Sequence, residues 1–319
     1  DNSSKTFRKT CIFVILGPIV ANKTDIELAE VETKFPEVNW GGNYSPPNCT
    51  ARHRVAIIVP YRDRLQHLAI FLNHMHPFLM KQQIEYGLFI IEQNGNSTQP
   101  LNLGKLINAA FTEIHRRYHK RGIYDCIIVH DPTIVPVNTR NLYRCSWYPR
   151  QLATRIMRAD NKSSYEPKLY GAVALTHEQY IKVNGFTNID LENDAIYYDM
   201  FKRCVLLTQY FIEYTPSSIG GYVTLFIFRY TLSPPPPRGI VSPLNLQDGL
   251  TSLSYTVKEF QPQKLYTYIK INLLVDPRET SVYKGIMWNR LQSIVNETTP
   301  TPTAIYTPGE DSFSQSDVD

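Results

Sequence analysis

Residues 55–93 read VAIIVPYRDRLQHLAIFLNHMHPFLMKQQIEYGLFIIEQ, and their pattern of apolar residues indicates the fold class. Its first six residues form a continuous apolar run that stops at Pro60, as in a parallel strand buried on both faces. A second apolar run, residues 86–93, predicts the next strand. Between them, apolar residues recur every three or four positions, the spacing of one helix face, at Leu65, Leu68, Leu72, Met75 and Leu79. The stretch therefore predicts a strand, a helix and a strand, with Pro77 expected to end or kink the helix.

The same alternation continues to residue 131. A second helix face is marked by Leu106, Ile107, Ala110, Phe111 and Ile114. Residues 124–131, YDCIIVHD, predict a third strand, and residues 265–275, LYTYIKINLLV, alternate as a later strand does. This order predicts an α/β fold whose amino-terminal βαβαβ half is Rossmann-like, with parallel strands. Ligands of such sheets bind beyond the carboxyl ends of the strands, where PYRDR (60–64) and HDPT (130–133) both fall.

The bulk composition fits a globular domain that binds a small anionic ligand. The 319 residues are 43% hydrophobic, enough to bury a large core. A surplus of four positive charges suits an anionic small molecule and is too weak to indicate nucleic acid. The densest basic run, HRRYHKR at 115–121, lies where a helical pattern ends, and we interpret it as a solvated helix end favoured by the dipole, in preference to a ligand site. Residues 296–319 lack a core pattern and are expected to be disordered.

Sequons and cysteines are typical of a chain exposed to the secretory lumen. Seven Asn-x-Ser/Thr sequons occur, at Asn2, Asn22, Asn43, Asn48, Asn96, Asn161 and Asn296. Five cysteines leave one odd: Cys11 and Cys49 near the start, Cys126 and Cys145 around the HDPT stretch, and Cys204 alone in a helix-like run. The longest apolar run near the start, residues 11–21, is too short to span a bilayer. We therefore expect a lumenal or secreted portion whose targeting segment lies outside this sequence.

Seven stretches together carry more information than any one of them alone. They are RVAIIVPYRDRLQHL (54–68), HPFLMKQQIEYGLFIIEQNGN (76–96), GKLINAAF (104–111), DCIIVHDPTIVPVNTRNLYRC (125–145), NGF (184–186), DGLTSLSY (248–255) and LYTYIKIN (265–272). In this order, across roughly residues 11–275, the chain resembles the β-1,4-galactosyltransferase family.

The resemblance implies a GT-A glycosyltransferase fold with a mixed sheet, normally in a type II membrane protein of the Golgi lumen. Enzymes of this family move galactose from UDP-galactose to a terminal N-acetylglucosamine or glucose, with inversion and with Mn²⁺. In that chemistry the metal and basic side chains neutralise the leaving diphosphate, while a carboxylate takes the proton of the attacking hydroxyl. The predicted organisation is a stem-proximal segment (1–53), a GT-A domain (54–295) and a tail (296–319). The family's two disulfides imply the pairs Cys11–Cys49 and Cys126–Cys145, with Cys204 free.

The nucleotide side of the family site is partly retained. The UDP-binding turn is intact at residues 60–64, and the first acid of the family's Asp-Val-Asp motif is present. A further nucleotide-binding stretch, Asn-Arg-Ala-Lys, reads Asn-Leu-Gly-Lys at 102–105 and has lost its Arg. Arg62 and Arg64 are predicted to contact phosphate. The residues predicted to bind UDP are Pro60, Tyr61, Arg62, Arg64 and Asp131.

The metal side of the family site is degraded. The second acid of Asp-Val-Asp reads Thr133, and the family's Met and His ligands read Leu225 and Phe228. No His occurs after His177 to replace the missing ligand. Because Thr is a poor Mn²⁺ ligand and Phe is none, Mn²⁺ is implied by the resemblance only and is not expected to bind well.

The catalytic acid of the family is also replaced. Its segment Trp-Gly-Trp-Gly-Gly-Glu-Asp-Asp-Asp should follow NGF, but here the chain reads TNIDLENDAIYYD (187–199). Counted without a gap, Asn193 takes the place of the mobile Trp, Ile196 of the Glu and Tyr197 of the catalytic Asp. A relocated base could come from Asp190, Glu192, Asp194 or Asp199, the last a remnant of the acid run. We favour an acidic loop cap or solvated face for these four.

The sequence therefore predicts a glycosyltransferase of this family with impaired or lost catalysis. Its partners would be a UDP-sugar and a glycan acceptor, without nucleic acid, and with a membrane only through an N-terminal anchor outside this sequence. The alternative is a noncatalytic protein that binds a nucleotide sugar or glycan and acts through partners.

Overall fold

The computed structural model describes residues 9–12, 17–95, 101–158, 162–165, 169–189, 193–225 and 248–274. These residues belong to one compact unit, Asp1–Val275. Its helices are α1 (Leu28–Lys34), α2 (Leu65–Lys81), α3 (Leu103–Arg117), α4 (His177–Lys182) and α5 (Asn193–Lys202), with the shorter turns η1 (His119–Arg121), η2 (Arg203–Leu207) and η3 (Leu250–Ser252). Its strands are β1 (Asn43–Tyr44), β2 (Arg54–Tyr61), β3 (Glu85–Gln93), β4 (Cys126–His130), β5 (Ile134–Pro136), β6 (Arg150–Gln151), β7 (Arg155–Met157), β8 (Ser163–Tyr165), β9 (Ala172–Thr176), β10 (Glu213–Tyr214), β11 (Gly221–Thr224), β12 (Tyr255–Pro262) and β13 (Thr267–Leu273). None of the described helices is both long and apolar enough to cross a membrane. The predicted disordered tail lies outside the described residues.

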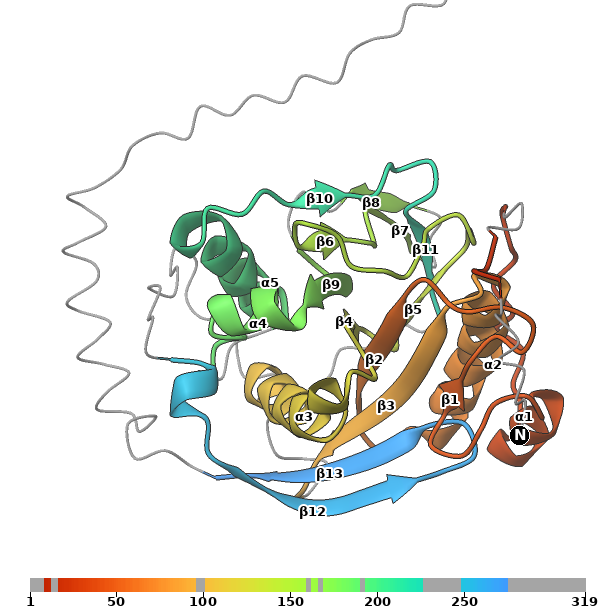
Figure 1. The fold of residues 1–319 in the computed structure, drawn as a ribbon, viewed down its shortest axis with the longest axis horizontal. Coiled ribbons are helices and arrows are strands. Elements are labelled where there is room, and N and C mark those ends of the chain that lie inside the picture. The colour runs from red at the N-terminus through yellow and green to blue at the C-terminus, as the bar shows by residue number, and fades with distance from the viewer. Residues whose placement is uncertain are drawn as a thin grey trace, which may run out of the picture. The chain divides into compact units, whose positions relative to one another are not determined.

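A mixed nine-stranded sheet organises the unit. Its strands follow the order β10-β6-β9-β4-β2-β3-β13-β12, and β1 also pairs with β3. Strand β2 is parallel to β3 and to β4, and β3 is parallel to β13, whereas β9 runs antiparallel to β4. The order of strands and helices predicted for residues 55–131, and the later strand near residue 270, are therefore confirmed (Figure 1).

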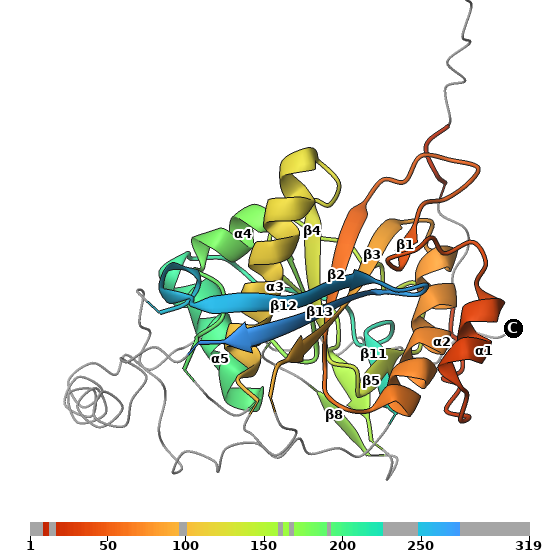
Figure 2. The same ribbon diagram turned by 90° about the horizontal axis from the view of Figure 1, so that it is seen from below.

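Helices cover both faces of the sheet, as Figures 1 and 2 show, with α2 on one face and α3 on the other. Along β2 the side chains alternate between the two faces. Val55, Ile57 and Val59 belong to the core that includes α2, whereas Ala56 and Ile58 belong to the core that includes α3. All five are completely buried, which explains why the strand reads as an unbroken apolar run.

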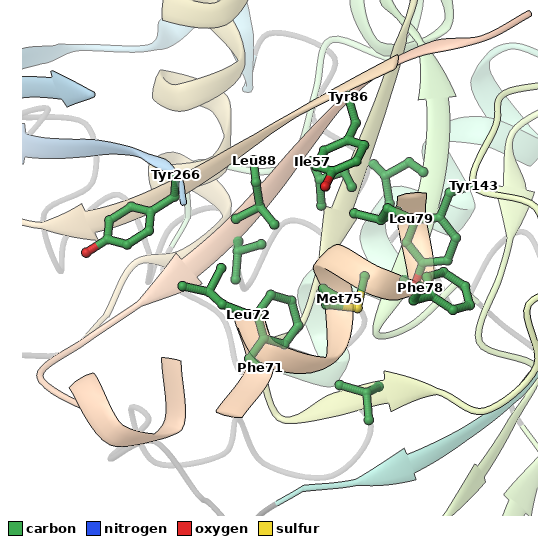
Figure 3. Packing of buried hydrophobic residues seen from close by; sticks show 14 of the residues in the cluster. Ile57, Phe71, Leu72, Met75, Phe78, Leu79, Tyr86, Leu88, Tyr143 and Tyr266 are labelled. Carbon is green, nitrogen blue, oxygen red and sulfur yellow. The ribbon is translucent and has the colours of Figure 1, made fainter. Parts of the chain in front are cut away.

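Pro77 was expected to end or kink helix α2, and the helix does not end there. The helix runs on to Lys81 with Pro77 inside it. A proline within a helix costs about 3 kcal/mol. Phe78 and Leu79 follow at once and are 1% and 0% exposed, packed in the core of Figure 3. Burying each contributes about 1.5–3 kcal/mol, so continuing the helix outweighs the cost of the proline.

The cysteine pairing implied by the family resemblance is confirmed. Disulfides join Cys11 to Cys49 and Cys126 to Cys145. Cys204 is a free and buried thiol. The second bridge fastens the start of β4 to the segment that leads into β6, so it holds the strand that carries the HDPT stretch.

A buried ion pair fixes α5 against the rest of the unit. Arg203 is 1% exposed and its Nε donates to Oδ2 of Asp199 at 2.5 Å. Its Nη1 donates to the carbonyl oxygen of Asp248 at 2.7 Å. The carboxylate of Asp248 also accepts a hydrogen bond from the backbone N–H of Asn188 at 3.0 Å. This network therefore joins α5, the segment after NGF and the segment before η3.

We predict that Arg203→Met lowers the free energy of unfolding by about 3–5 kcal/mol, because two carboxylates would remain buried without their cation. Arg54→Met is the matched control, since Arg54 pairs with Asp125 at the surface, with side chains 41% and 53% exposed. Arg54→Met should lower the free energy of unfolding by no more than about 1 kcal/mol. Urea denaturation of both variants measures the difference, and equal losses would contradict the assigned role of Arg203.

Candidate functional site

The turn between β2 and α2 is the first part of the site. Asp63 adopts a left-handed backbone conformation with φ 45°, which turns the chain sharply from the strand into the helix. The hydroxyl oxygen of Tyr61 accepts the backbone N–H of Arg64 at 3.0 Å and braces this turn. Burial raises the pKa of Tyr61, so its phenol stays neutral. The side chains of Arg62 and Arg64 are half-buried at the carboxyl end of β2.

The start of α2 adds to the positive character of this turn. Arg64 is the N-cap residue, and within the described part of the chain its side chain makes no capping hydrogen bond to the first turn. The first N–H groups of a helix point outward and carry the positive end of its dipole. Two arginines and these N–H groups together suit a phosphate.

Asp131 stands at the carboxyl end of β4, next to this turn in the sheet. Its Oδ1 accepts the backbone N–H of Thr133 at 2.8 Å and the hydroxyl of Thr133 at 2.7 Å. Its own N–H donates to the carbonyl oxygen of Gly171 at 2.7 Å. The carboxylate therefore closes a local turn on the residue that stands at the family's second acid position.

His130 is a packed histidine at this strand end, as the strand alternation predicts. It is completely buried, and burial lowers its pKa to about 3, so the ring is neutral. Its Nδ1 donates to the carbonyl oxygen of Asp131 at 2.9 Å, and its Nε2 accepts from the hydroxyl of Tyr143 at 2.9 Å. The hydroxyls of Tyr143 and Tyr222 lie 2.8 Å apart, which extends the chain of hydrogen bonds to β11.

The structure brings two of the three family metal positions together. The second sheet has the order β5-β11-β7-β8, and the N–H of Leu225, just after β11, donates to the carbonyl oxygen of Thr133 at 2.8 Å. Leu225 is 6% exposed and belongs to the apolar core around α2. Phe228 lies outside the described residues. The described side chains here offer one carboxylate, one hydroxyl and an apolar wall, a set that does not fit Mn²⁺.

The side chains of Leu103 and Lys105, at the start of α3, are buried in the protein. Asn102 caps the helix by accepting the N–H of Lys105 at 3.0 Å. Leu103, at the position of the lost Arg, is buried. Lys105 is 1% exposed, and its ammonium donates to the carbonyl oxygen of Leu274 at 2.7 Å. This stretch therefore ties α3 to the end of β13.

The residues counted onto the family's catalytic acids lie in the core. Tyr197 is 3% exposed, with its ring centroid 5.8 Å from Phe186 and 5.5 Å from Tyr170, and Ile196 is completely buried. Asp199 is 2% exposed and pairs with Arg203, and burial raises its pKa. Asp190 and Glu192, and the side chains of Asn193 and Asp194, lie outside the described part.

Two buried carboxylates near these segments were not anticipated from the sequence. Glu92, at the end of β3, is 9% exposed and accepts a hydrogen bond from the hydroxyl of Tyr268 on β13. Asp248 is the centre of the Arg203 network. The position of Glu92 at the end of an apolar strand was a usable signal, because ligands gather at that edge. The partner of Asp248 lies 45 residues away, and no local pattern indicates it.

Comparisons with known proteins agree with the fold and the order of these segments. A family model described as the N-terminal region of glycosyl transferase group 7 matches residues 11–146. Bovine β-1,4-galactosyltransferase 1 is 31% identical over 271 residues, which cover 82% of this chain and 64% of that protein. Bovine β-1,4-galactosyltransferase 3 is 36% identical over 283 residues, which cover 85% of this chain and 69% of that protein.

A solved structure shows the same fold at lower identity. It is a mutant of Drosophila β-1,4-galactosyltransferase 7 in complex with manganese, UDP-Gal and xylobiose, with a TM-score of 0.57 and 21% sequence identity. The match covers 74% of this chain and 98% of that one. With the mixed sheet, the fold is that of the GT-A glycosyltransferases, and the chain belongs to the β-1,4-galactosyltransferase family.

Proposed function

We propose that this chain is a nucleotide-sugar-binding member of its family in which metal-assisted galactosyl transfer is impaired. The donor would be UDP-galactose and the acceptor a glycan with terminal N-acetylglucosamine or glucose. The observation that carries the proposal is the closed turn of Asp131 on Thr133, where a two-carboxylate metal site would need a second acid. Complete loss of transfer would leave a noncatalytic nucleotide-sugar- or glycan-binding protein.

The arginine turn would carry the binding of the nucleotide. Arg62 and Arg64 would pair with the diphosphate, and the first turn of α2 would add backbone donors. Asp131 would accept a hydrogen bond from the ribose or uracil, a role that needs only one carboxylate. The bound UDP-Gal in the Drosophila relative supports this class of ligand.

Impaired transfer would follow from two separate losses. A cation beside Thr133 would exchange tightly held water for too few oxygen ligands, because Leu225 presents an apolar side chain there. A proton acceptor for the sugar hydroxyl must come within hydrogen-bond reach of it. Tyr197 and Asp199 are 3% and 2% exposed, so neither is presented to a substrate.

The compartment would be the Golgi lumen or the extracellular space. Two disulfides support an oxidising environment, because such bonds persist there and are rare in the cytosol. The predicted boundaries of the domains, at residues 53/54 and 295/296, belong to the same proposal.

We predict that Arg62→Ala and Arg64→Ala each weaken UDP binding by about 1.5–3 kcal/mol, the usual worth of a hydrogen bond to a charged group. Arg54→Ala is the matched control, because Arg54 lies at the opposite end of β2 and pairs with Asp125. Isothermal titration calorimetry measures all three. Unchanged affinity in both turn variants, or an equal loss in the control, would remove the arginines from the site.

We also predict that UDP binds with the same affinity in the presence and absence of Mn²⁺. The Thr133→Asp variant should bind UDP more weakly without metal, because a second carboxylate would stand close to Asp131 and to the diphosphate. Titration of UDP with and without saturating Mn²⁺ tests both statements. A gain of tenfold or more from Mn²⁺ in the unchanged chain would contradict the proposed loss of the metal site.

A further inference from the structure

Three histidines from different segments meet at the end of α3. His115 lies in the last turn of α3, His119 begins η1, and His177 begins α4. One ring nitrogen of each lies within 4.8 Å of those of the other two. The Nδ1 atoms of His115 and His177 are 3.1 Å apart, and the rings of His119 and His177 stack with centroids 3.9 Å apart.

Of these three rings, that of His177 is buried and neutral. His177 is 1% exposed, and burial, followed by the charges of His119 and His115, lowers its pKa to about 3. His115 and His119 are partly exposed, so the cluster lies at the surface with one open side. The ring of Phe111 lies 5.7 Å from that of His115 and 5.4 Å from that of His177 and gives the cluster an apolar wall.

The hydrogen bonds of the protein do not satisfy His177. Among the residues that the structure describes, its Nε2 is buried and has no hydrogen-bond partner. Leaving a buried polar atom unpaired costs about 1–3 kcal/mol. The contact between the Nδ1 atoms of His177 and His115 is a hydrogen bond only if one of these two nitrogens carries a proton. Coordination of a cation by Nδ1, the nitrogen that faces His115, would replace the contact with His115 and leave Nε2 as the protonated nitrogen of the neutral ring.

His119 is already oriented as a ligand. Its Nδ1 lies 3.0 Å from the carbonyl oxygen of Tyr124 and, in the neutral ring, donates to it. This fixes the tautomer and leaves Nε2 as the nitrogen with a lone pair. A backbone carbonyl that holds the far nitrogen is the usual support of a metal-binding histidine.

The charges around the cluster do not oppose a cation as strongly as the sequence suggests. Arg116 and Arg117 lie between the two histidines in the sequence, yet both pair with Glu113, at 2.7 and 3.0 Å. Glu113 is itself 3% exposed. The carboxylate therefore draws both guanidinium groups to one side of the helix end.

We propose that His115, His119 and His177 form a binding site for a borderline divalent cation of the Zn²⁺ class. Neutral imidazoles suit Zn²⁺, Cu²⁺ and Ni²⁺, whereas Mn²⁺ prefers oxygen ligands. With Zn–N bonds of 2.0–2.1 Å, ligand nitrogens at a tetrahedral ion lie about 3.3 Å apart, close to the observed 3.1 Å. A small shift of the η1 turn that keeps the hydrogen bond between His119 and Tyr124 would shorten the longer separations, and water would take the fourth position.

This site is distinct from the nucleotide site. Thr176, which precedes His177, pairs with Cys126 at the start of β4, whereas Asp131 follows the end of that strand. The cluster therefore lies at the opposite edge of the sheet from the arginine turn. A bound cation there would join the end of α3 to the start of α4, which Figures 1 and 2 show beside each other.

Calorimetric titration of Zn²⁺ into the whole chain, without a polyhistidine tag, tests the proposal. We expect one ion per chain, and at least a tenfold weaker affinity in His115→Gln and in His119→Gln, since even a residue that only supports a ligand is worth 10- to 100-fold. His67→Gln on α2 is the matched control and should bind Zn²⁺ as the unchanged chain does. His115 and His119 are partly exposed, and circular dichroism will verify that both variants fold.

Cobalt gives an independent readout of the coordination. Co²⁺ bound by three imidazoles and water should produce the intense visible absorption of a four-coordinate ion, and this absorption should be lost in His119→Gln. Absence of Zn²⁺ binding below millimolar concentration would overturn the proposal. Equal affinity in the His115, His119 and His67 variants would overturn it as well.

Discussion

Strand β2 is buried on both faces, and its burial determines where polar side chains can lie in the sheet. Its side chains from Val55 to Val59 are completely buried, so neither face of the strand can carry a polar function. Polar chemistry is thereby confined to the ends of β2 and of its parallel neighbours β3 and β4. Arg62 and Arg64, Glu92 and Asp131 all follow or end these strands. The site is an edge of the sheet, and its composition is decided by a few residues at strand ends.

At that edge, the nucleotide-binding half and the metal-binding half of the family site differ in what holds them together. The arginine turn is held by the β2–α2 connection itself, through the left-handed Asp63 and the contact between Tyr61 and Arg64, so it persists without any metal. By the family resemblance, the metal half depends on acids, a Met and a His from separate segments. We propose that it is lost here, because Thr133 and Leu225 stand at two of these positions and Asp131 accepts hydrogen bonds from Thr133 in a local turn.

Periodicity in the sequence predicted β2, α2, β3, α3 and β4. Each of these elements buries one or two faces, so its apolar residues recur at the spacing of a strand or a helix. The disulfides followed from the family resemblance. The continuation of α2 past Pro77 was not predictable, since it depends on how well Phe78 and Leu79 pack against residues distant in the sequence. The same holds for the inward orientation of Lys105, the burial of Tyr197 and the pairing of Arg203 with Asp248. Each of these is decided by contacts across the fold.

The basic run HRRYHKR, residues 115–121, is the clearest case of contacts that local sequence patterns do not reveal. The structure confirms the predicted helix end, with Arg116 exposed, and it also places His115 of this run against His177, 62 residues away. The spacing of four residues between His115 and His119 was a local signal of one shared helix face. Its third member could not be found without knowing that β9 delivers α4 to the end of α3.

Transfer of radiolabelled galactose from UDP-galactose to N-acetylglucosamine, with Mn²⁺ present, measures whether this chain retains galactosyltransferase activity. The protein should be folded and saturated with both substrates, and an active relative should serve as the positive control. The loss of the second acid and the burial of Tyr197 predict turnover far below about 1 per second, the lower end of ordinary enzymes. Turnover at or above that rate would show that a complete catalytic site exists and would contradict this account.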